Sequence, residues 1–548
     1  MAGDRARQRT SGQDAGEAGE LAELARCRQQ GRAAVARNRE TFVDLVVRAR
    51  EAAQRRDYEM AAVNARIAAF FAQWRHPGVF VSPDLERLLL GIGLDALPAP
   101  RPRAASRRSC ARVLHVAGNV SILGGIPRMI RRWIQRDGAR VHSLALTRQA
   151  PDRVPGVLDR AVHDTGGRVH DLRGTLIERA AELRQIAETA DVVALHTFDH
   201  DVVPIMALAP DASPPTMFVN HSDHGFWLGA SVSHVVANLR ESGRALSHSR
   251  RGIAAARNLV VPTIIDVPSR TQSREQAKRT LGVDPNQVLL ISIARSAKYR
   301  TFGGINFAEH HVGLLQQHAN AVLMVVGPGG EHDWQAAIAA TNGRIRMVPA
   351  TEATALYFEA ADIYVDSFPW VSTTSLLEAG SYGLPLVSRE VFATGECGVL
   401  AADMPGLGPM LKTRTANSYV AALAHLIADE HARLALGERT RASIVAAHTG
   451  MGWQRAVEAA YGRALGCGPN RCLDPHVAPA CGEQPDVFLP LVLGKEVEVD
   501  TIIEDHLGMM PLGRRLATWN ELGRARHLRR SFAQLLPDIW YRRYQKWR

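Results

Sequence analysis

The sequence predicts an α/β fold with two similar lobes, each built on a parallel sheet between helices. Short apolar runs alternate with longer segments of helical periodicity, which is typical of βαβ units. The runs form two series separated by a polar stretch, so we expect one lobe over 110–270 and a second over 284–465. The predicted strands cover 112–117, 141–146, 169–172, 191–195 and 216–219 in the first lobe and 288–293, 321–326, 345–348, 363–365 and 385–387 in the second.

Three further regions flank the predicted lobes. Residues 1–18 are rich in Gly, Arg, Asp and Gln without apolar periodicity, so we expect them to be disordered. Residues 19–97 carry apolar side chains at helical spacing and predict a helical module, which a proline-rich segment joins to the first lobe. Residues 466–548 form a basic C-terminal extension.

The composition is that of a globular chain. Of the 548 residues, 46% are hydrophobic and 22% are charged, which excludes a mainly disordered, collagenous or coiled-coil protein. No uninterrupted apolar stretch reaches about 18 residues, so no membrane-spanning helix is predicted. The N-terminal segment lacks the apolar core of a secretory signal, and the six cysteines are too scattered for a disulfide framework. These features predict a cytoplasmic protein.

Much of the net charge of +11 lies at the C-terminus. Residues 511–548 contain ten Lys and Arg against two acidic residues, a local excess of +8, and aromatic side chains such as Trp540 and Tyr544 lie among them. Such a tail packs against its own protein, lies on an anionic membrane, or binds nucleic acid. We favour packing, keep peripheral contact with the inner membrane surface as the second interpretation, and expect no nucleic acid partner.

A glycine-rich turn follows the first predicted strand. Gly124 and Gly125 let the backbone approach a ligand closely, and the N–H groups of the helix start that follows can hold a phosphate or a sugar. The alternative is an ordinary turn between a strand and a helix. No Walker A sequence occurs anywhere in the chain.

A pair of cations follows the first strand of the second lobe. In Ser-Ile-Ala-Arg-Ser-Ala-Lys, Arg295 and Lys298 come where the strand ends. A guanidinium fork and an ammonium point charge suit a diphosphate. Taken alone, the pair is also consistent with solvated charges on a loop.

The most specific segment of the chain is 361–387. It reads as a strand, a turn and a helix start that carries Thr373, Thr374 and Ser375, where hydroxyls and free N–H groups form an anion site. Glu378 lies about one turn further along and can accept hydrogen bonds from a ribose. The alternative is a capped helix packed between two strands.

These segments resemble the donor-binding domain of GT-B glycosyltransferases, most closely glycosyltransferase family 4. The resemblance rests on "ARSAK", "VVGPGGE" and "ADIYVDSFPWVSTTSLLEAGSYGLPLV", and more loosely on "GGIPRMI" and "DVVALHT" in the first lobe. It implies two Rossmann-like lobes and a nucleotide-sugar donor, with Arg295 and Lys298 on the diphosphate and Glu378 on the ribose. It also implies a closing helix that returns to the first lobe, and catalysis without metal or further cofactor.

One position departs from the family pattern. Retaining members of family 4 carry a second glutamate eight residues before the ribose-binding one, and here that position is Trp370. The segment "FPWVSTTSLLEAG" is also similar to the O-GlcNAc-transferase-like family, whose members are inverting. The stereochemical outcome therefore stays open.

Histidines and aspartates follow two predicted strands of the first lobe. His221, Asp223 and His224 are the candidate catalytic residues, because a group here could take a proton from an acceptor hydroxyl. The alternative is that they are hydrogen-bonded structural side chains. Asp199 and Asp201 formally match a DxD metal motif, and the nearby histidines could join a metal site, but we favour no metal.

A second candidate metal set lies near the C-terminus. Cys467, Cys472, His476 and Cys481 do not have a standard zinc spacing, so we favour free thiols in a loop over a structural zinc.

Together these observations predict a glycosyltransferase that moves a sugar from a nucleotide-sugar to a hydroxyl of a glycan or lipid-linked acceptor. Two alternatives remain. A sugar-nucleotide epimerase would use the same donor lobe without an acceptor, and a non-catalytic scaffold would bind no nucleotide-sugar.

Overall fold

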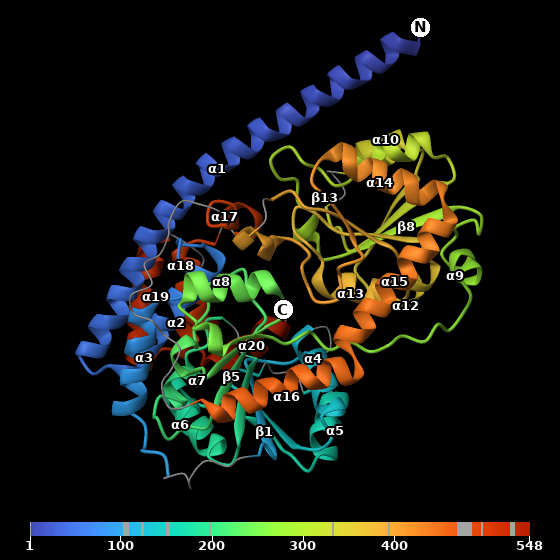
Figure 1. The fold of residues 1–548 in the computed structure, drawn as a ribbon. Coiled ribbons are helices and arrows are strands. Elements are labelled where there is room, and N and C mark those ends of the chain that lie inside the picture. Colours follow the sequence, from blue (N-terminus) through green and yellow to red (C-terminus); the bar gives the residue numbers. More distant parts are fainter. Residues whose placement is uncertain are drawn as a thin grey trace.

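The two lobes and the helices that flank them are arranged around two parallel sheets (Figure 1). The computed structural model describes residues 2–101, 109–121, 125–149, 154–196, 199–330, 334–392, 395–467, 485–494, 497–526 and 532–547. Among these residues, no helix combines the length and the apolar character that crossing a bilayer requires.

The first lobe contains a seven-stranded parallel sheet with the order β3-β2-β1-β4-β5-β6-β7. The sequence predicts the first five strands. It does not predict β6 and β7, which are only four and three residues long. The strands are β1 (Arg112–Ala117), β2 (Val141–Leu146), β3 (Val169–Asp171), β4 (Val192–His196), β5 (Thr216–Asn220), β6 (Val235–Asn238) and β7 (Asn258–Val260). The helices are α4 (Gly125–Arg136), α5 (Gly156–Asp164), α6 (Leu176–Ala187), α7 (Val203–Ala207) and α8 (Glu241–Arg251), with 3-10 turns η1 (Ala230–Val232) and η2 (Ala255–Arg257).

The second lobe contains a six-stranded parallel sheet with the order β10-β9-β8-β11-β12-β13. Its first five strands agree with the sequence, and the edge strand β13 was missed because it is only three half-exposed residues long. The strands are β8 (Val288–Ile293), β9 (Ala321–Val326), β10 (Ile345–Val348), β11 (Ile363–Val365), β12 (Leu386–Arg389) and β13 (Leu411–Thr413). The helices are α9 (Arg274–Thr280), α10 (Glu309–Gln317), α11 (Gln335–Ala340), α12 (Ala355–Ala360), α13 (Thr373–Ser381), α14 (Ala416–Ala428) and α15 (Glu430–His448), with η3 (Ser296–Tyr299) and η5 (Gly395–Leu400).

The helix α16 (Gly450–Gly466) leaves the second lobe and packs on the first (Figure 1). Its Trp453 and Tyr461 side chains are buried in a cluster with the central strands of the first sheet. The indole N–H of Trp133 on α4 donates to the Tyr461 hydroxyl at 2.8 Å. This return helix agrees with the closing helix that the resemblance implies.

The N-terminal helices share one hydrophobic core with the first lobe and the C-terminal extension. They are α1 (Ala2–Gln54), α2 (Tyr58–Trp74) and α3 (Pro83–Asp95). The structure has helix from Ala2 onward, where the sequence predicts disorder over 1–18. The segment contains no proline, so nothing in its backbone interrupts the helix that starts there. Glu20 on α1 also reaches the second lobe, where it accepts a hydrogen bond from Arg389 at 2.6 Å.

The C-terminal extension packs on the N-terminal helices and the first lobe, which agrees with the interpretation favoured from the sequence. Its elements are α17 (Leu489–Val492), α18 (Val499–His506), η6 (Leu507–Met509), α19 (Leu512–Arg526), η7 (Phe532–Leu535) and α20 (Asp538–Trp547). The buried carboxylate of Asp486 accepts hydrogen bonds from His76 (2.6 Å) and Arg250 (2.9 Å), and so joins three regions of the chain. A Cβ on Gly31 would lie 1.7 Å from the main-chain oxygen of Val487, so this close approach to α1 requires glycine.

Candidate active site between the lobes

The start of α13 in the second lobe is held by the buried carboxylate of Asp366. Its Oδ1 accepts hydrogen bonds from the Ser372 amide (2.9 Å) and hydroxyl (2.6 Å), and its Oδ2 accepts one from the Ser388 hydroxyl at 3.2 Å. Burial raises the pKa of Asp366, and the hydrogen bonds from Ser372 oppose that shift. The Ser372 hydroxyl is thus engaged with Asp366 and does not cap the helix.

Three of the predicted donor-binding residues form the first turn of α13. Thr373, Thr374 and Ser375 are half-buried there, and the turn's N–H groups have no side-chain cap from Ser372. An uncapped helix start offers N–H donors and a partial positive charge. This geometry can hold an anion such as a diphosphate.

Arg295 and Lys298 lie beside this helix start, on the turn that follows β8. The Arg295 side chain is exposed. The ammonium of Lys298 donates to the main-chain oxygen of Val371 at 2.5 Å and lies 4.7 Å from the centre of the Trp370 ring. Burial lowers the pKa of Lys298, the carboxylate of Asp366 opposes this shift, and Arg295 adds to it. The two predicted cations are therefore brought close to α13.

Glu378, the predicted ribose ligand, faces the first lobe. Its carboxylate lies 3.6 Å from Arg128 and 3.6 Å from Arg132, both on α4. Arg132 also donates to Asp266 at 2.8 Å. Sequence reasoning missed these two arginines, although their spacing of four residues just after the glycine turn places them on one face of a helix. Gly125 begins α4, and Gly124 lies outside the described residues.

Asp223 is bound by an arginine that also joins the two lobes. Arg240 donates to both of its carboxylate oxygens, at 2.6 and 2.9 Å, and to the main-chain oxygen of Ala401 at 2.7 Å. Although burial acts to raise it, the charge and hydrogen bonds of Arg240 hold the pKa of Asp223 well below its usual range. Asp223 is thus engaged in a buried ion pair, and the geometry does not favour it as a proton acceptor.

His224 contacts the second lobe directly. Its ring packs edge-on against Trp370, with ring centres 4.9 Å apart, and its Nδ1 lies 3.3 Å from the Asp223 carboxylate. Burial lowers the pKa of His224, and Asp223 opposes this shift. Trp370, the residue that departs from the family 4 pattern, therefore makes an aromatic contact between the lobes.

His221 is the first member of a chain of four hydrogen-bonded histidines. Its Nε2 lies 3.0 Å from His196 Nδ1, and His196 Nε2 lies 3.1 Å from His115 Nδ1. His115 Nε2 lies 3.0 Å from His142 Nδ1, and His142 Nε2 lies 2.9 Å from the main-chain oxygen of Asp137. The chain runs through the core of the first lobe and ends at half-buried His221. The sequence singles out His221 and His196, but not the other two rings.

The chain follows from the register of the first sheet. His142 lies beside Val113 and His196 beside Ala117, each two residues from His115 along β1. Residues two apart share a face of a sheet, so the rings line up diagonally on one face. The indole of Trp133 packs edge-on against His115 with ring centres 5.8 Å apart and shields the chain from solvent.

The Asp137 carbonyl determines the tautomer of every ring. A carbonyl oxygen only accepts, so His142 must carry its proton on Nε2 and present an unprotonated Nδ1. His115 and His196 must then donate from Nε2 in turn, and so must His221. The Nδ1 of His221 is therefore left as a lone-pair acceptor, and no described group donates to it. Burial lowers the pKa of His221 to about 4, while Asp223 opposes the shift, so the ring is neutral near pH 7.

The candidate metal residues have other partners. Asp199 accepts a hydrogen bond from Gln73 at 2.6 Å, and Asp201 accepts one from Thr147 at 2.5 Å. Within the described part of the chain, no group of three or more His, Cys, Asp or Glu is arranged to hold a metal ion. Cys467 lies 3.6 Å from the main-chain oxygen of His234. The other three members of that set, Cys472, His476 and Cys481, lie outside the described residues.

Comparison with known proteins bears on the fold. No protein-family model and no curated protein matches the sequence. A glycosyltransferase structure from Rickettsia africae matches with a TM-score of 0.50 and 11% identity, over 65% of this chain and 99% of its own. Anabaena HepE in complex with UDP matches with a TM-score of 0.49 and 15% identity, over 64% of this chain and 99% of its own. An O-GlcNAc transferase mutant from Thermobaculum terrenum matches with a TM-score of 0.44 and 14% identity, over 79% of this chain and 82% of its own. The likeness to the Rickettsia structure confirms the predicted fold: this chain has the two-lobed GT-B architecture.

Proposed function

We propose that the protein is a glycosyltransferase that moves a sugar from a nucleotide-sugar to an acceptor hydroxyl. The observation that carries this proposal is the juxtaposition of two sets of groups across the lobes. The second lobe contributes an uncapped helix start, two cations and Glu378, a set suited to a nucleoside diphosphate. The first lobe contributes His221 and His224, which follow the carboxyl end of β5.

The donor groups have separate tasks in this proposal. Arg295 and Lys298 stabilise the charge that develops on the leaving diphosphate, together with the N–H groups at the start of α13. Glu378 accepts hydrogen bonds from the ribose once Arg128 and Arg132 give way to it. Gly124 and Gly125 close over the sugar phosphate. These cations do the work that a metal would otherwise do, so we propose that no metal or other cofactor is needed.

His221 is the proposed general base. Its Nδ1 takes the proton of the acceptor hydroxyl while the hydroxyl oxygen attacks the anomeric carbon and the bond to the diphosphate breaks. Asp223 and His224 do not take the proton in this proposal. Asp223 binds Arg240, and His224 packs against Trp370 of the second lobe. A base on the acceptor side favours a single displacement with inversion, and the anomeric configuration of the product tests this.

The acceptor is proposed to be a glycan or a lipid-linked sugar. The C-terminal extension exposes Phe532 (78% exposed) and Trp540 (56% exposed) near Arg543, and this face would contact an anionic membrane peripherally. Such contact would place the protein at the cytoplasmic surface of the membrane.

A thermal-shift screen against UDP-, GDP-, ADP- and TDP-sugars, with and without Mg²⁺, tests the proposal. A ligand at about 100 times its Kd adds roughly 2.7 kcal/mol of stability, which raises the Tm measurably. A shift with one nucleotide family that does not need Mg²⁺, followed by release of free nucleotide as sugar is transferred, would support it. Isomerised nucleotide-sugar without transfer would instead indicate an epimerase. A folded protein that responds to none of the donors would indicate a scaffold.

A further inference from the structure

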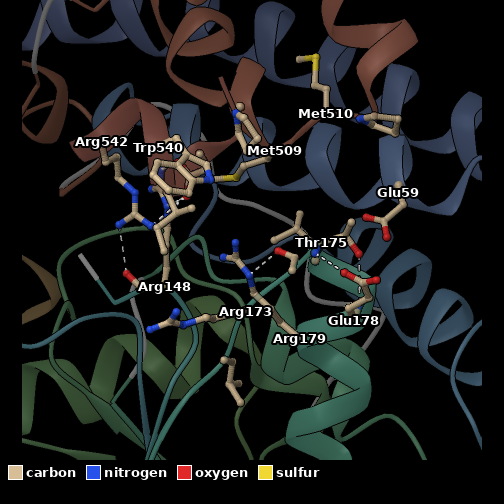
Figure 2. Close-up of a pocket in the computed structure, with 18 of the residues that line it drawn as sticks. Glu59, Arg148, Arg173, Thr175, Glu178, Arg179, Met509, Met510, Trp540 and Arg542 are labelled. Atoms are coloured by element: carbon tan, nitrogen blue, oxygen red, sulfur yellow. Dashed lines mark hydrogen bonds and ion pairs between the residues drawn. The ribbon is translucent and has the colours of Figure 1, made fainter. Parts of the chain in front are cut away.

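A cavity of about 620 Å³ lies between the first lobe and the C-terminal extension (Figure 2). Its floor is the loops that follow β2 and β3 and the start of α6, and its roof is η6 and α20. This volume is typical of small-molecule sites. No residue of the proposed donor site lines it.

The cavity has an excess of positive charge. Six arginines and four carboxylates line it, which leaves two positive charges uncompensated. Burial also raises the pKa of Glu59, one of the four acids. The lining arginines are Arg148, Arg173, Arg179, Arg515, Arg542 and Arg543.

The carboxylate of Asp538 is already shared by two of these arginines. Arg148 donates to both of its oxygens, at 2.8 and 3.2 Å, and Arg542 lies 3.0 Å away. Asp171 pairs in the same way with Arg173 at 3.0 Å. Arg148, Arg173 and Arg179 come from the floor of the cavity and Arg542 from its roof, and Figure 2 shows all four among the residues that line it.

Arg179, Arg515 and Arg543 have no carboxylate partner among the described residues. Arg179 is buried and donates only to the main-chain oxygens of Gly174 (2.9 Å) and Thr147 (3.1 Å). Arg515 likewise donates only to main-chain oxygens. The Arg543 guanidinium lies over the Trp540 ring, 5.2 Å from its centre. The charge of Asp538 acts on the buried groups of Arg179 and Arg515, but this carboxylate is already shared by Arg148 and Arg542. An anion in the cavity would therefore stabilise these buried guanidinium groups further.

The rest of the roof is apolar. Beside these arginines, η6 and the start of α20 contribute hydrocarbon, sulfur and an indole to the lining, including Met509 and Trp540, which are labelled in Figure 2. A ligand that fills both halves must carry an anionic group next to an apolar part. The apolar lining includes Leu172, Met509, Met510, Leu512, Ile539 and Trp540.

The cavity lies on the same sheet edge as His221. Arg148 follows β2 and His221 follows β5, and the strand order β2-β1-β4-β5 separates them by three strand spacings. Neighbouring strands are about 4.8 Å apart, so the two sites are roughly 14 Å apart along the edge. An extended acceptor that occupies both sites would have to span this distance.

We propose that this cavity binds a phosphate or diphosphate group of the acceptor, next to an apolar part of the same molecule. The excess of two charges matches a phosphate group, which carries about −1.5 to −2 at neutral pH, and guanidinium forks bind phosphate oxygens bidentately. That the ligand is the acceptor rests on the proposed function. Binding of phosphate does not.

The test is titration calorimetry with phenyl phosphate and inorganic pyrophosphate, with neutral phenyl glucoside as the uncharged probe. All variants carry Lys298→Ala, so that the donor site does not contribute. The pair Arg173→Ala and Arg543→Ala removes two exposed guanidinium groups, and we expect it to weaken phenyl phosphate binding by about tenfold or more. Arg168→Ala is the matched control, because Arg168 is also exposed but lies at the opposite end of β3.

Vesicles of phosphatidylglycerol distinguish a lipid from a soluble source of the phosphate. The site is supported if phenyl phosphate binding is lost in the double variant Arg173→Ala/Arg543→Ala and kept in Arg168→Ala. Vesicle binding that follows the same pattern indicates a lipid as the source of the phosphate. Equal affinity in all variants, or equal binding of phenyl glucoside, overturns it. If no nucleotide-sugar binds the unaltered chain while phosphate binding follows this pattern, the proposed function fails and the anion site stands.

Discussion

The imidazole Nε2 of His142 lies 2.9 Å from the main-chain oxygen of Asp137, and this contact sets the protonation of His221 three rings away. Because the carbonyl can only accept, each ring in the chain donates from Nε2 and accepts at Nδ1. The imidazole of His221 is thereby left with an unprotonated Nδ1. The position of one backbone oxygen thus decides which nitrogen of His221 can take a proton.

Replacing His221 should abolish most of the transfer activity without loss of donor binding. Loss of a general base lowers the rate by about 10²–10⁴-fold. We expect His221→Ala to lower kcat in this range, with donor affinity measured by thermal shift unchanged. The exposed His431→Ala variant is the control. Equal rates for His221→Ala and the unaltered protein would exclude His221 as the base.

The rate of transfer should be insensitive to moderate acid. The pKa of His221 is lowered to about 4, so the ring stays an acceptor at pH values where an ordinary histidine is protonated. The profile of kcat/KM reports the groups of the free enzyme. We expect its acid limb near that value, measured between pH 4 and 8 with a buffer series at constant ionic strength. An acid limb near pH 6.5 would contradict this assignment.

The buried histidines should make folding stability fall in acid. Burial lowers the pKa of His115 and His196 well below the ordinary value, so the unfolded chain binds more protons below about pH 6.5. The unfolding free energy therefore falls as the pH falls through this window. The slope is up to about 1.4 kcal/mol per pH unit for each histidine. Denaturant titrations from pH 4.5 to 7.5 measure the slope.

A variant isolates one contribution to that slope. His115→Gln removes one ring, and the slope should decrease relative to the unaltered chain even if the variant is less stable at every pH. His431→Gln should leave the slope as it is, since that side chain is exposed. An unchanged slope in His115→Gln would mean that the ring is not held neutral.

Asp223→Asn should destabilise the protein rather than slow the chemistry directly. The substitution leaves the buried Arg240 guanidinium with only the Asp403 carboxylate, 3.7 Å away, and breaking a buried pair costs about 3–5 kcal/mol. We expect a lower Tm and a looser contact between the lobes, which proteolysis of the region around Arg240 would detect. If the Tm is unchanged and kcat alone falls by about 10²-fold or more, Asp223 is a catalytic group.

Glu378→Ala should weaken the donor. Two hydrogen bonds to a ribose contribute about 0.5–1.5 kcal/mol each, so the donor Kd should rise by roughly tenfold. Arg295→Ala should also raise the donor Kd, because it removes a cation proposed to bind the diphosphate. Arg300→Ala, another exposed arginine on the same loop, is the control. Unchanged donor affinity in both Glu378→Ala and Arg295→Ala would place the donor elsewhere.

The amino-acid sequence is enough to predict the two-lobed fold and several groups of the proposed donor site. Buried parallel strands read as continuous apolar runs, so ten of the thirteen strands were evident, and the carboxyl ends of these strands identified Lys298, the start of α13 and His221. The three missed strands are short, and two of them lie at sheet edges where little burial marks the pattern.

The contacts that these groups make cannot be predicted from the sequence. Arg128 and Arg132 meet Glu378 across the lobes, and Arg240 engages Asp223, through contacts between residues far apart in the chain. The histidine chain depends on the register of neighbouring strands, and the arginine cavity on where the C-terminal extension docks. Hydrogen bonds and charges act over a few ångströms in space, whereas periodicity in a sequence reports only which side of one element is buried.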